Sequence, residues 1–327
     1  MRYKPLGQSG IEASVVAFGA WAIGGWMWGG TDEPAAVAAI QAAIDADINF
    51  IDTAPGYGLG LSERIVGTAI AGRRDEVVIA TKCGLLWDAD LGAATTLPPG
   101  RELRRSLAPD SIRRECEASL QRLGTDYIDL YQTHWQDDDT PIADTMAALL
   151  DLKRQGKIRA IGVSNASVEH MEQYRAVGPL DSDQERYSML DRAIEGSQLS
   201  YCRERGIAVL AYSPLSKGLL TGKIGPDREF AGDDLRRRRN NPRFSIESRR
   251  RIAAMLDQFK PIAQSHNLTL GQLAIAWTVA QPGLTHALVG ARNPQQAREN
   301  AGAGDAVLSP DELSQMEAII TQHVGAT

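Results

Sequence analysis

The chain has 327 residues and a formal net charge of −6, with 43% hydrophobic and 23% charged residues. The acidic balance argues against a general binder of nucleic acid or of anionic membranes. A chain of this length can bury roughly three quarters of its unfolded surface, so it needs no disulfides to hold a core.

Short runs rich in β-branched and apolar residues alternate with helical stretches along the whole chain. Several runs are continuously apolar, which is typical of parallel strands covered on both faces. The predicted strands cover residues 15–20, 49–53, 77–82, 127–134, 158–164, 182–184, 208–212 and 287–291. The predicted helices cover 34–45, 62–70, 109–121, 142–154 and 197–205, and Ser62 with the following Glu63 is interpreted as a helix start.

Strands that alternate with helices, without long linkers, predict parallel βα units. We expect an α/β fold of the (β/α)8 TIM barrel type rather than a doubly wound open sheet. The first unit carries no glycine-rich dinucleotide fingerprint, and polar residues fall at the carboxyl ends of most strands. Residues 2–14 predict an N-terminal β-hairpin that closes the barrel floor. Residues 225–245 predict an inserted loop, and further helices are expected towards the C-terminus of a single domain spanning 1–327.

Polar residues that suit proton donation follow the predicted strands. Asp52 ends the second strand and Tyr57 follows it, Lys82 ends the third strand, and His134 ends the fourth. In a barrel these groups converge on one mouth. A tyrosine titrates at about 10, and we expect the Lys82 ammonium to lower the pKa of Tyr57. Asp52 would hold Lys82 charged, and His134 would donate a hydrogen bond to a substrate carbonyl. Such a site has no electron donor of its own, so it needs an external hydride donor.

Two segments after the last strands suit an anionic donor molecule. Residues 213–222 form a small-residue loop whose backbone amides could wrap a pyrophosphate, and Tyr212 before it could stack on a flat ring. Residues 290–294 open a helix, and a helix N-terminus after a barrel strand is a ready phosphate site. Arg292 suits a planar, charge-assisted contact with a 2′-phosphate.

On these residues the chain resembles the aldo-keto reductases. Residues 52–58, Asp-Thr-Ala-Pro-Gly-Tyr-Gly, are similar to the family pattern Asp-x-Ala-x-x-Tyr-Gly. Stretches such as Gly-Val-Ser-Asn and Leu-Leu-Thr-Gly are similar to the bacterial general-stress and sugar-linked branch, which lies near the potassium-channel β-subunits. The resemblance implies NADPH as cofactor, ordered binding of cofactor and then substrate, and a catalytic tetrad of Asp52, Tyr57, Lys82 and His134. It implies cofactor contacts from Gly19, Ala20, Trp21, Asp52, Ser164, Asn165, Gln184, Tyr212, Ser213, Pro214, Leu215, Lys217, Gly218, Leu219, Gly290, Ala291, Arg292, Gln296, Glu299 and Asn300.

Several tryptophans fall in or just after predicted strand ends, and aromatic walls suit ligand pockets. We predict a substrate pocket formed by Trp21, Tyr57, Trp87, His134 and Trp135. No metal site is predicted, because the aspartates at 137–139 are interpreted as a solvated loop. The arginines at 236–239 are interpreted as a solvated face of the inserted loop, or as flanking the cofactor or a phosphorylated substrate.

The sequence therefore predicts an NADPH-dependent reductase of aldehydes or ketones, with sugars and reactive aldehydes among its candidate substrates. No nucleic-acid or membrane partner is expected. Two other hypotheses stay open, namely a cofactor-binding regulatory subunit with little turnover and a Schiff-base lyase that uses Lys82. Three widely spaced cysteines, no apolar leader and no stretch of ~20 apolar residues predict a cytoplasmic protein.

Overall fold

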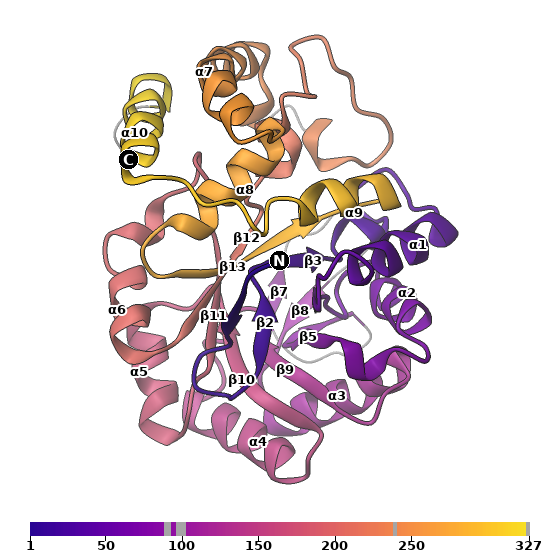
Figure 1. Cartoon of the computed structure of the whole chain (residues 1–327). Helices are drawn as coiled ribbons and strands as arrows, with labels where there is room; N and C mark the ends of the chain where they lie inside the picture. Colours follow the sequence, from indigo (N-terminus) through magenta and orange to yellow (C-terminus); the bar gives the residue numbers. More distant parts are fainter. Residues whose placement is uncertain (88–92, 96–102, 238–240, 325–327) are drawn as a thin grey trace.

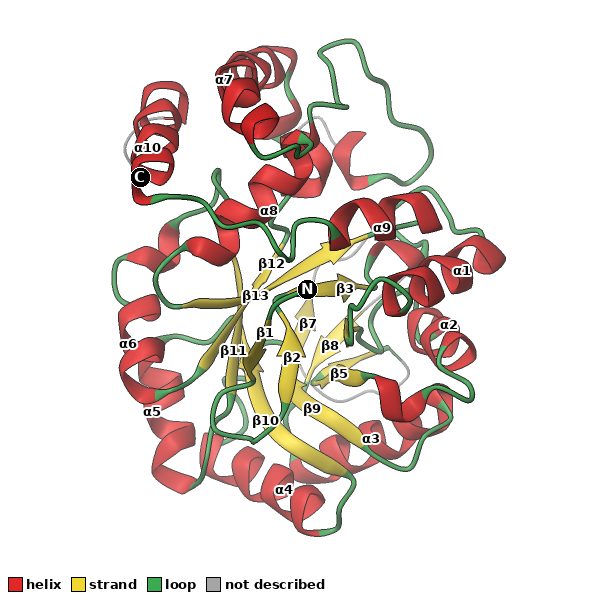
Figure 2. Cartoon of the chain, viewed as in Figure 1, coloured by secondary structure: helices red, strands yellow, loops and turns green. Residues whose placement is uncertain are grey.

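The computed structural model describes residues 1–87, 93–95, 103–237 and 241–324. Within these residues, eight parallel strands close into a barrel, and the last strand pairs with the first (Figure 2). The predicted (β/α)8 barrel is confirmed, and every predicted strand matches an observed one to within three residues at either end. The barrel strands are β3 (Val16–Gly19), β4 (Phe50–Asp52), β5 (Val78–Cys83), β9 (Ile128–Thr133), β10 (Ile158–Ser164), β11 (Ser182–Arg186), β12 (Ala208–Tyr212) and β13 (Leu284–Gly290).

Helices surround the barrel on its outer face (Figure 1). They follow the strands in turn as α1 (Glu33–Ile44), α2 (Leu61–Ala69), α3 (Pro109–Leu123), α4 (Ile142–Arg154), α5 (Val168–Val177), α6 (Gln198–Arg205), α8 (Leu270–Ala280) and α9 (Pro294–Ala301). The sequence did not indicate α5, because its only buried side chains are Met171 and Tyr174 and its apolar stripe is thin. The start of α2 also differs from expectation. Gly60 in the left-handed region caps it, and Ser62 lies inside the helix.

The floor of the barrel is closed by the predicted N-terminal hairpin, whose strands β1 (Tyr3–Pro5) and β2 (Glu12–Ser14) are antiparallel. Leu6 and Ile11 in its connection are buried and join the cluster that fills the barrel interior. That cluster includes Phe50 and Val78, the first residues of β4 and β5, so the hairpin covers the amino ends of the strands. The opposite end, where the strands finish, is left for the functional site.

Three additions lie outside the regular βα units. A small antiparallel sheet follows β5 and consists of β6 (Leu85–Leu86), β7 (Ala93–Thr95) and β8 (Leu103–Arg105), with β8 in the middle. The sequence did not predict this sheet. The described part of the segment 225–245 carries only two short 3-10 turns, at Leu235–Arg237 and Pro242–Phe244, and residues 238–239 of the arginine cluster lie outside the described residues. Two further helices, α7 (Ile246–Ser265) and α10 (Pro310–Val324), pack on each other beyond the barrel ring (Figure 1).

Among the helices of the described residues, none combines the length and the apolar character needed to cross a membrane.

Candidate active site

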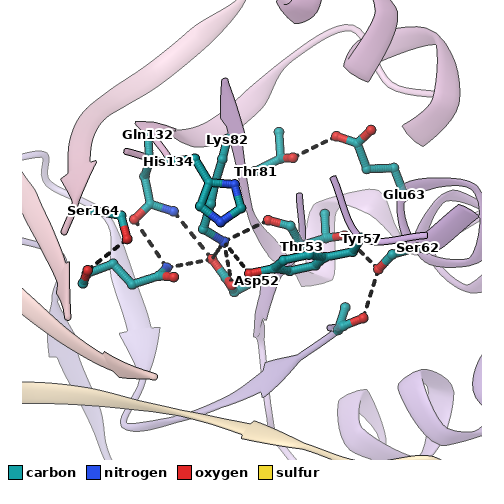
Figure 3. A network of polar contacts seen from close by, with 12 residues as sticks. Asp52, Thr53, Tyr57, Ser62, Glu63, Thr81, Lys82, Gln132, His134 and Ser164 are labelled. Atoms are coloured by element: carbon teal, nitrogen blue, oxygen red, sulfur yellow. Dashed lines mark hydrogen bonds and ion pairs between the residues drawn. The ribbon is translucent and has the colours of Figure 1, made fainter. Parts of the chain in front are cut away.

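Lys82 lies at the centre of a buried polar network at the carboxyl end of β5 (Figure 3). Its ammonium donates to the two carboxylate oxygens of Asp52, at 2.7 and 2.9 Å, and to the carbonyl of Thr53 at 2.9 Å. The Tyr57 hydroxyl lies 3.4 Å from the same nitrogen. Lys82 is fully buried and Asp52 is 3% exposed. Because a buried charge is tolerated only when it is paired and hydrogen-bonded, each member of this ion pair depends on the other.

Two glutamine amides complete the shell of Asp52. Gln184 donates from Nε2 to Asp52 Oδ2 at 2.8 Å, and Gln132 donates to the same oxygen at 3.3 Å. Gln184 was predicted as a site residue, whereas Gln132 was missed. The available signal was its place two residues before His134, since residues two apart share one face of a strand. Lys82, Gln184 and Gln132 together make four hydrogen bonds to the Asp52 carboxylate and hold it in place below the mouth of the barrel.

Tyr57 and His134 face each other above this ion pair, with ring centroids 5.7 Å apart and planes at 84°. Burial, then the nearby charges of Lys82 and Arg105, hold the pKa of His134 well below its usual value, so the imidazole is neutral at pH 7. Its Nδ1 is buried and has no hydrogen-bond partner among the described residues. His134 lines the cavity, and a neutral imidazole carries one N–H that can be donated to a ligand there.

The pKa of Tyr57 differs from expectation. We expected the Lys82 ammonium to lower it, but burial and, secondly, the charge of Asp52 raise the pKa well above the ordinary value of 10.0. The physical reason is that Asp52 neutralises Lys82 at direct contact, so the phenol faces an ion pair of small net charge while losing its water. Tyr57 is therefore protonated at neutral pH, which is the state that a proton donor requires.

A cavity of about 900 Å³ opens over these residues, within the roughly 300–1,000 Å³ range of ligand pockets. All predicted cofactor and substrate residues line it except Ala20, Trp87, Leu219 and Ala291. These four residues therefore do not fit the predicted pocket as it is lined among the described residues. Ala20, Leu219 and Ala291 are buried in the hydrophobic core, and Trp87 lies against the Arg122 guanidinium, 5.7 Å from the ring centroid. Sequence adjacency to a strand end does not fix which way a side chain points.

The strand ends opposite Lys82 form a second hydrogen-bonded group. Tyr212 donates from its hydroxyl to Asn165 Oδ1 at 2.9 Å, and Asn165 donates to the carbonyl of His134 at 3.1 Å. Ser164 donates to the carbonyl of Gln184 at 2.8 Å. These contacts tie the ends of β9, β10, β11 and β12 together around the cavity, which fits the predicted contacts to a flat ring.

The loop after β12 is the segment that the sequence indicated as an anion cradle. Ser213, Ser216, Lys217 and Gly218 have φ values of 59°, 45°, 58° and 94°, so the backbone turns sharply here. The amides of Ser216 and Gly218 already donate to the carbonyls of Ser213 and Leu215, at 2.8 and 2.9 Å. Ser213, Lys217 and Gly218 line the cavity, and the pyrophosphate contact of this loop stays a prediction.

Arg292 connects this end of the cavity to the loop after β3. Its guanidinium donates to the carbonyls of Trp28 and Gly30, at 3.2 and 2.6 Å. The insertion after β12 reaches the same loop, since Asp233 accepts a hydrogen bond from the amide of Met27 at 2.8 Å. Arg292 thus lines the cavity, and its hydrogen bonds to Trp28 and Gly30 also hold the loop after β3 beside it.

Glu115 of α3 supports the strand that carries Lys82, because it accepts hydrogen bonds from the Gly84 amide at 2.8 Å and from the Ser111 hydroxyl at 3.1 Å. Burial raises the pKa of Glu115 to about 7. A carboxyl with a raised folded-state pKa contributes stability that is complete below its unfolded pKa, about 4.3, and is lost as the pH rises through 7.

We therefore expect the free energy of unfolding to fall by up to about 3 kcal/mol between pH 5 and 8 from this group. Urea titrations across that range measure the fall. Glu115→Gln should reduce the slope, and Glu172→Gln, an exposed position on α5, should leave it as in the wild type. Glu185, whose pKa burial also raises to about 7, leaves a residual slope in both variants. Identical slopes for Glu115→Gln and the wild type would contradict the prediction.

Comparisons with known proteins agree with this geometry. The model of the Aldo/keto reductase family matches residues 15–321. The chain is 44% identical to the NADH-specific methylglyoxal reductase of Escherichia coli (strain K12) over 97% of both chains. It is 44% identical to an aldo-keto reductase of Bacillus subtilis (strain 168), over 90% of this chain and 86% of the relative. The solved structure of a glycerol dehydrogenase from Gluconobacter oxydans superposes with a TM-score of 0.87 at 40% identity, covering 97% of this chain and 94% of the other.

Proposed function

The chain belongs to the aldo/keto reductase family, and from this premise we propose that it reduces aldehydes or ketones to alcohols with a nicotinamide dinucleotide. The observation that carries the proposal is the Tyr57 hydroxyl, 3.4 Å from the buried ammonium of Lys82 and directly beneath a ligand-sized cavity. A phenol held protonated beside a neutral histidine is suited to donate a proton to a carbonyl oxygen.

Each residue then has one task. The bound dinucleotide supplies the hydride. Tyr57 donates the proton to the carbonyl oxygen, and His134 donates a hydrogen bond that orients the carbonyl. Lys82, neutralised by Asp52, holds the phenol in place and stabilises the charge that develops on its oxygen when the proton leaves.

The Schiff-base alternative has little support in the geometry. The Lys82 ammonium is fully buried and donates to Asp52 and Thr53, and Lys82 does not line the cavity among the described residues. A substrate carbonyl would have to displace this ion pair before it reached the nitrogen. Borohydride treatment in the presence of an aldehyde should therefore leave Lys82 unmodified.

The direct test is the oxidation of NADPH and NADH at 340 nm with a panel of small aldehydes, methylglyoxal and glyceraldehyde included. Small polar carbonyls are the appropriate panel because relatives carry the names methylglyoxal reductase and glycerol dehydrogenase. Turnover supports the reductase. Tight dinucleotide binding without turnover of any member of the panel would instead favour a regulatory, cofactor-binding subunit.

We further propose NADPH as the preferred dinucleotide, with Arg292 as the contact for its 2′-phosphate. Support comes from the place of Arg292 two residues before α9, lining the same cavity as the loop after β12. The relative in Escherichia coli is named NADH-specific, so the two dinucleotides have to be compared directly.

Arg292→Gln is expected to raise the Kd of NADPH by about 10- to 100-fold and to change that of NADH by less than about threefold, because a charge-assisted contact to phosphate is lost. Tryptophan fluorescence quenching measures both constants. Arg298→Gln, which removes an exposed arginine from the same helix, is the matched control. Equal losses of affinity for NADPH and NADH would contradict the phosphate role. They would indicate that Arg292 acts by holding the loop after β3 through Trp28 and Gly30.

A further inference from the structure

Arg105 is a cation of the cavity that the proposed reaction does not use. It is the last residue of β8, the middle strand of the small sheet after β5, where it pairs with Leu85 and Ala93. Leu103 and Arg105 both line the cavity, and Arg104 between them does not. Side chains alternate along a strand, so the sheet presents Arg105 to the cavity and turns Arg104 away from it.

The guanidinium lies beside the reacting end of the cavity. It lies over the ring of Trp135, 4.9 Å from the centroid, and its charge contributes to the low pKa of the neighbouring His134. Trp135, the ring that the guanidinium covers, follows the end of β9. The segments predicted to contact the dinucleotide phosphates lie elsewhere, after β12 and at the start of α9.

No carboxylate pairs with Arg105 among the described residues, and its buried Nε has no hydrogen-bond partner there. Burial acts to raise the pKa of Asp137, but hydrogen bonds from Leu107, Thr140 and Asp139 lower it, and the charge of Arg105 adds the smallest lowering effect. Asp137, however, is not the solvated residue that the sequence indicated. It is 8% exposed, and its oxygens accept hydrogen bonds from the Leu107 and Asp139 amides and from the Thr140 hydroxyl.

We propose that Arg105 binds an anionic oxygen group, a carboxylate or a phosphate, carried by the carbonyl substrate. The inference rests on the proposed function and narrows it to anionic carbonyl compounds. A planar guanidinium with no carboxylate partner among the described residues is suited to recognise a carboxylate or a phosphate, and it binds them most strongly where water is excluded. In a chain of net charge −6, a cation at this point also provides local attraction for a negative substrate. Because Arg105 lies next to His134 and Trp135, the anionic group would sit a short chain away from the carbonyl.

The test compares pairs of aldehydes that differ only in the anionic group. Succinic semialdehyde is paired with butanal for the carboxylate, and glyceraldehyde 3-phosphate with glyceraldehyde for the phosphate. The measured quantity is the ratio of kcat/KM for the anionic to that for the neutral member. We expect the wild type to favour the anionic member of at least one pair, and that pair identifies the group. Arg105→Gln should lower this ratio by about 30-fold or more. Arg105→Lys should lower it less, because an ammonium keeps the charge but cannot make the two parallel hydrogen bonds of a guanidinium.

Two matched variants and one binding measurement complete the design. Arg104→Gln removes the same charge from the opposite face of β8, and its ratio should equal that of the wild type. Arg186→Gln removes another arginine that lines the cavity, at the end of β11. Succinate should bind the complex with oxidised dinucleotide in isothermal titration calorimetry, and Arg105→Gln should abolish this binding without a change in melting temperature.

If the wild type reduces butanal, any one of three results would overturn the inference that Arg105 binds the anionic group. They are an unchanged ratio in Arg105→Gln, an equal fall in Arg104→Gln, and a fall confined to Arg186→Gln. Absence of reduction of all four aldehydes by the wild type would overturn the proposed function instead.

Discussion

Replacing Tyr57 with phenylalanine is expected to lower kcat for aldehyde reduction by about 10²- to 10⁴-fold, the range that a positioned general acid contributes. Only the hydroxyl is removed. The ring keeps its contacts with His134 and Trp21, at centroid distances of 5.7 and 6.2 Å, so the cavity keeps its shape. The Kd of the dinucleotide should therefore stay within about threefold of the wild-type value, since the lost interaction belongs to the transition state.

The matched control is Tyr212→Phe, which removes the other tyrosine hydroxyl of the cavity. That hydroxyl donates to Asn165 at 2.9 Å, and its loss should mainly weaken dinucleotide binding. Steady-state kinetics and fluorescence titration on both variants separate the two effects. Turnover by Tyr57→Phe at a tenth or more of the wild-type rate would remove Tyr57 as the acid, and a larger loss of kcat in Tyr212→Phe would point to that residue.

The sequence predicted the barrel because its strands are short, apolar and regularly spaced, and because polar residues recur where strands end. Once the strands are known, the meeting of Asp52, Lys82 and His134 follows, since the carboxyl ends of parallel barrel strands converge. Tyr57 follows from its place in the loop after β4. This part of the site can therefore be predicted from each strand end separately, without knowledge of contacts between distant segments.

What the sequence missed depends on packing between distant segments. Gln132 gains its role only because Gln184 and Asp52 lie within hydrogen-bond reach in the folded chain. The sheet that presents Arg105 pairs β8 with β6 and with β7, and its strands are too short to give a clear alternating pattern. The raised pKa of Tyr57 is a consequence of burial, which a spacing pattern does not report.

Replacing Lys82 with methionine should be the most destabilising single change in the site. The carboxylate of Asp52 would stay buried, with only the amides of Gln132 and Gln184 as partners. Removing one partner of a buried ion pair typically costs about 3–5 kcal/mol, because an uncompensated charge is left behind. Urea unfolding at pH 7 measures the loss, and kcat should fall with it because the phenol loses its neighbouring cation.

The double variant Lys82→Met with Asp52→Asn separates the two contributions. It removes both charges and keeps an amide oxygen that accepts from Gln184, so most of the lost stability should return. Activity should stay low, because stability needs only that the charges balance, whereas proton transfer from Tyr57 needs the ammonium itself. Melting and urea curves of the wild type, both single variants and the double variant form the thermodynamic cycle. If the double variant regained activity together with stability, Lys82 and Asp52 would be structural partners, and the proton donor would have to work without them.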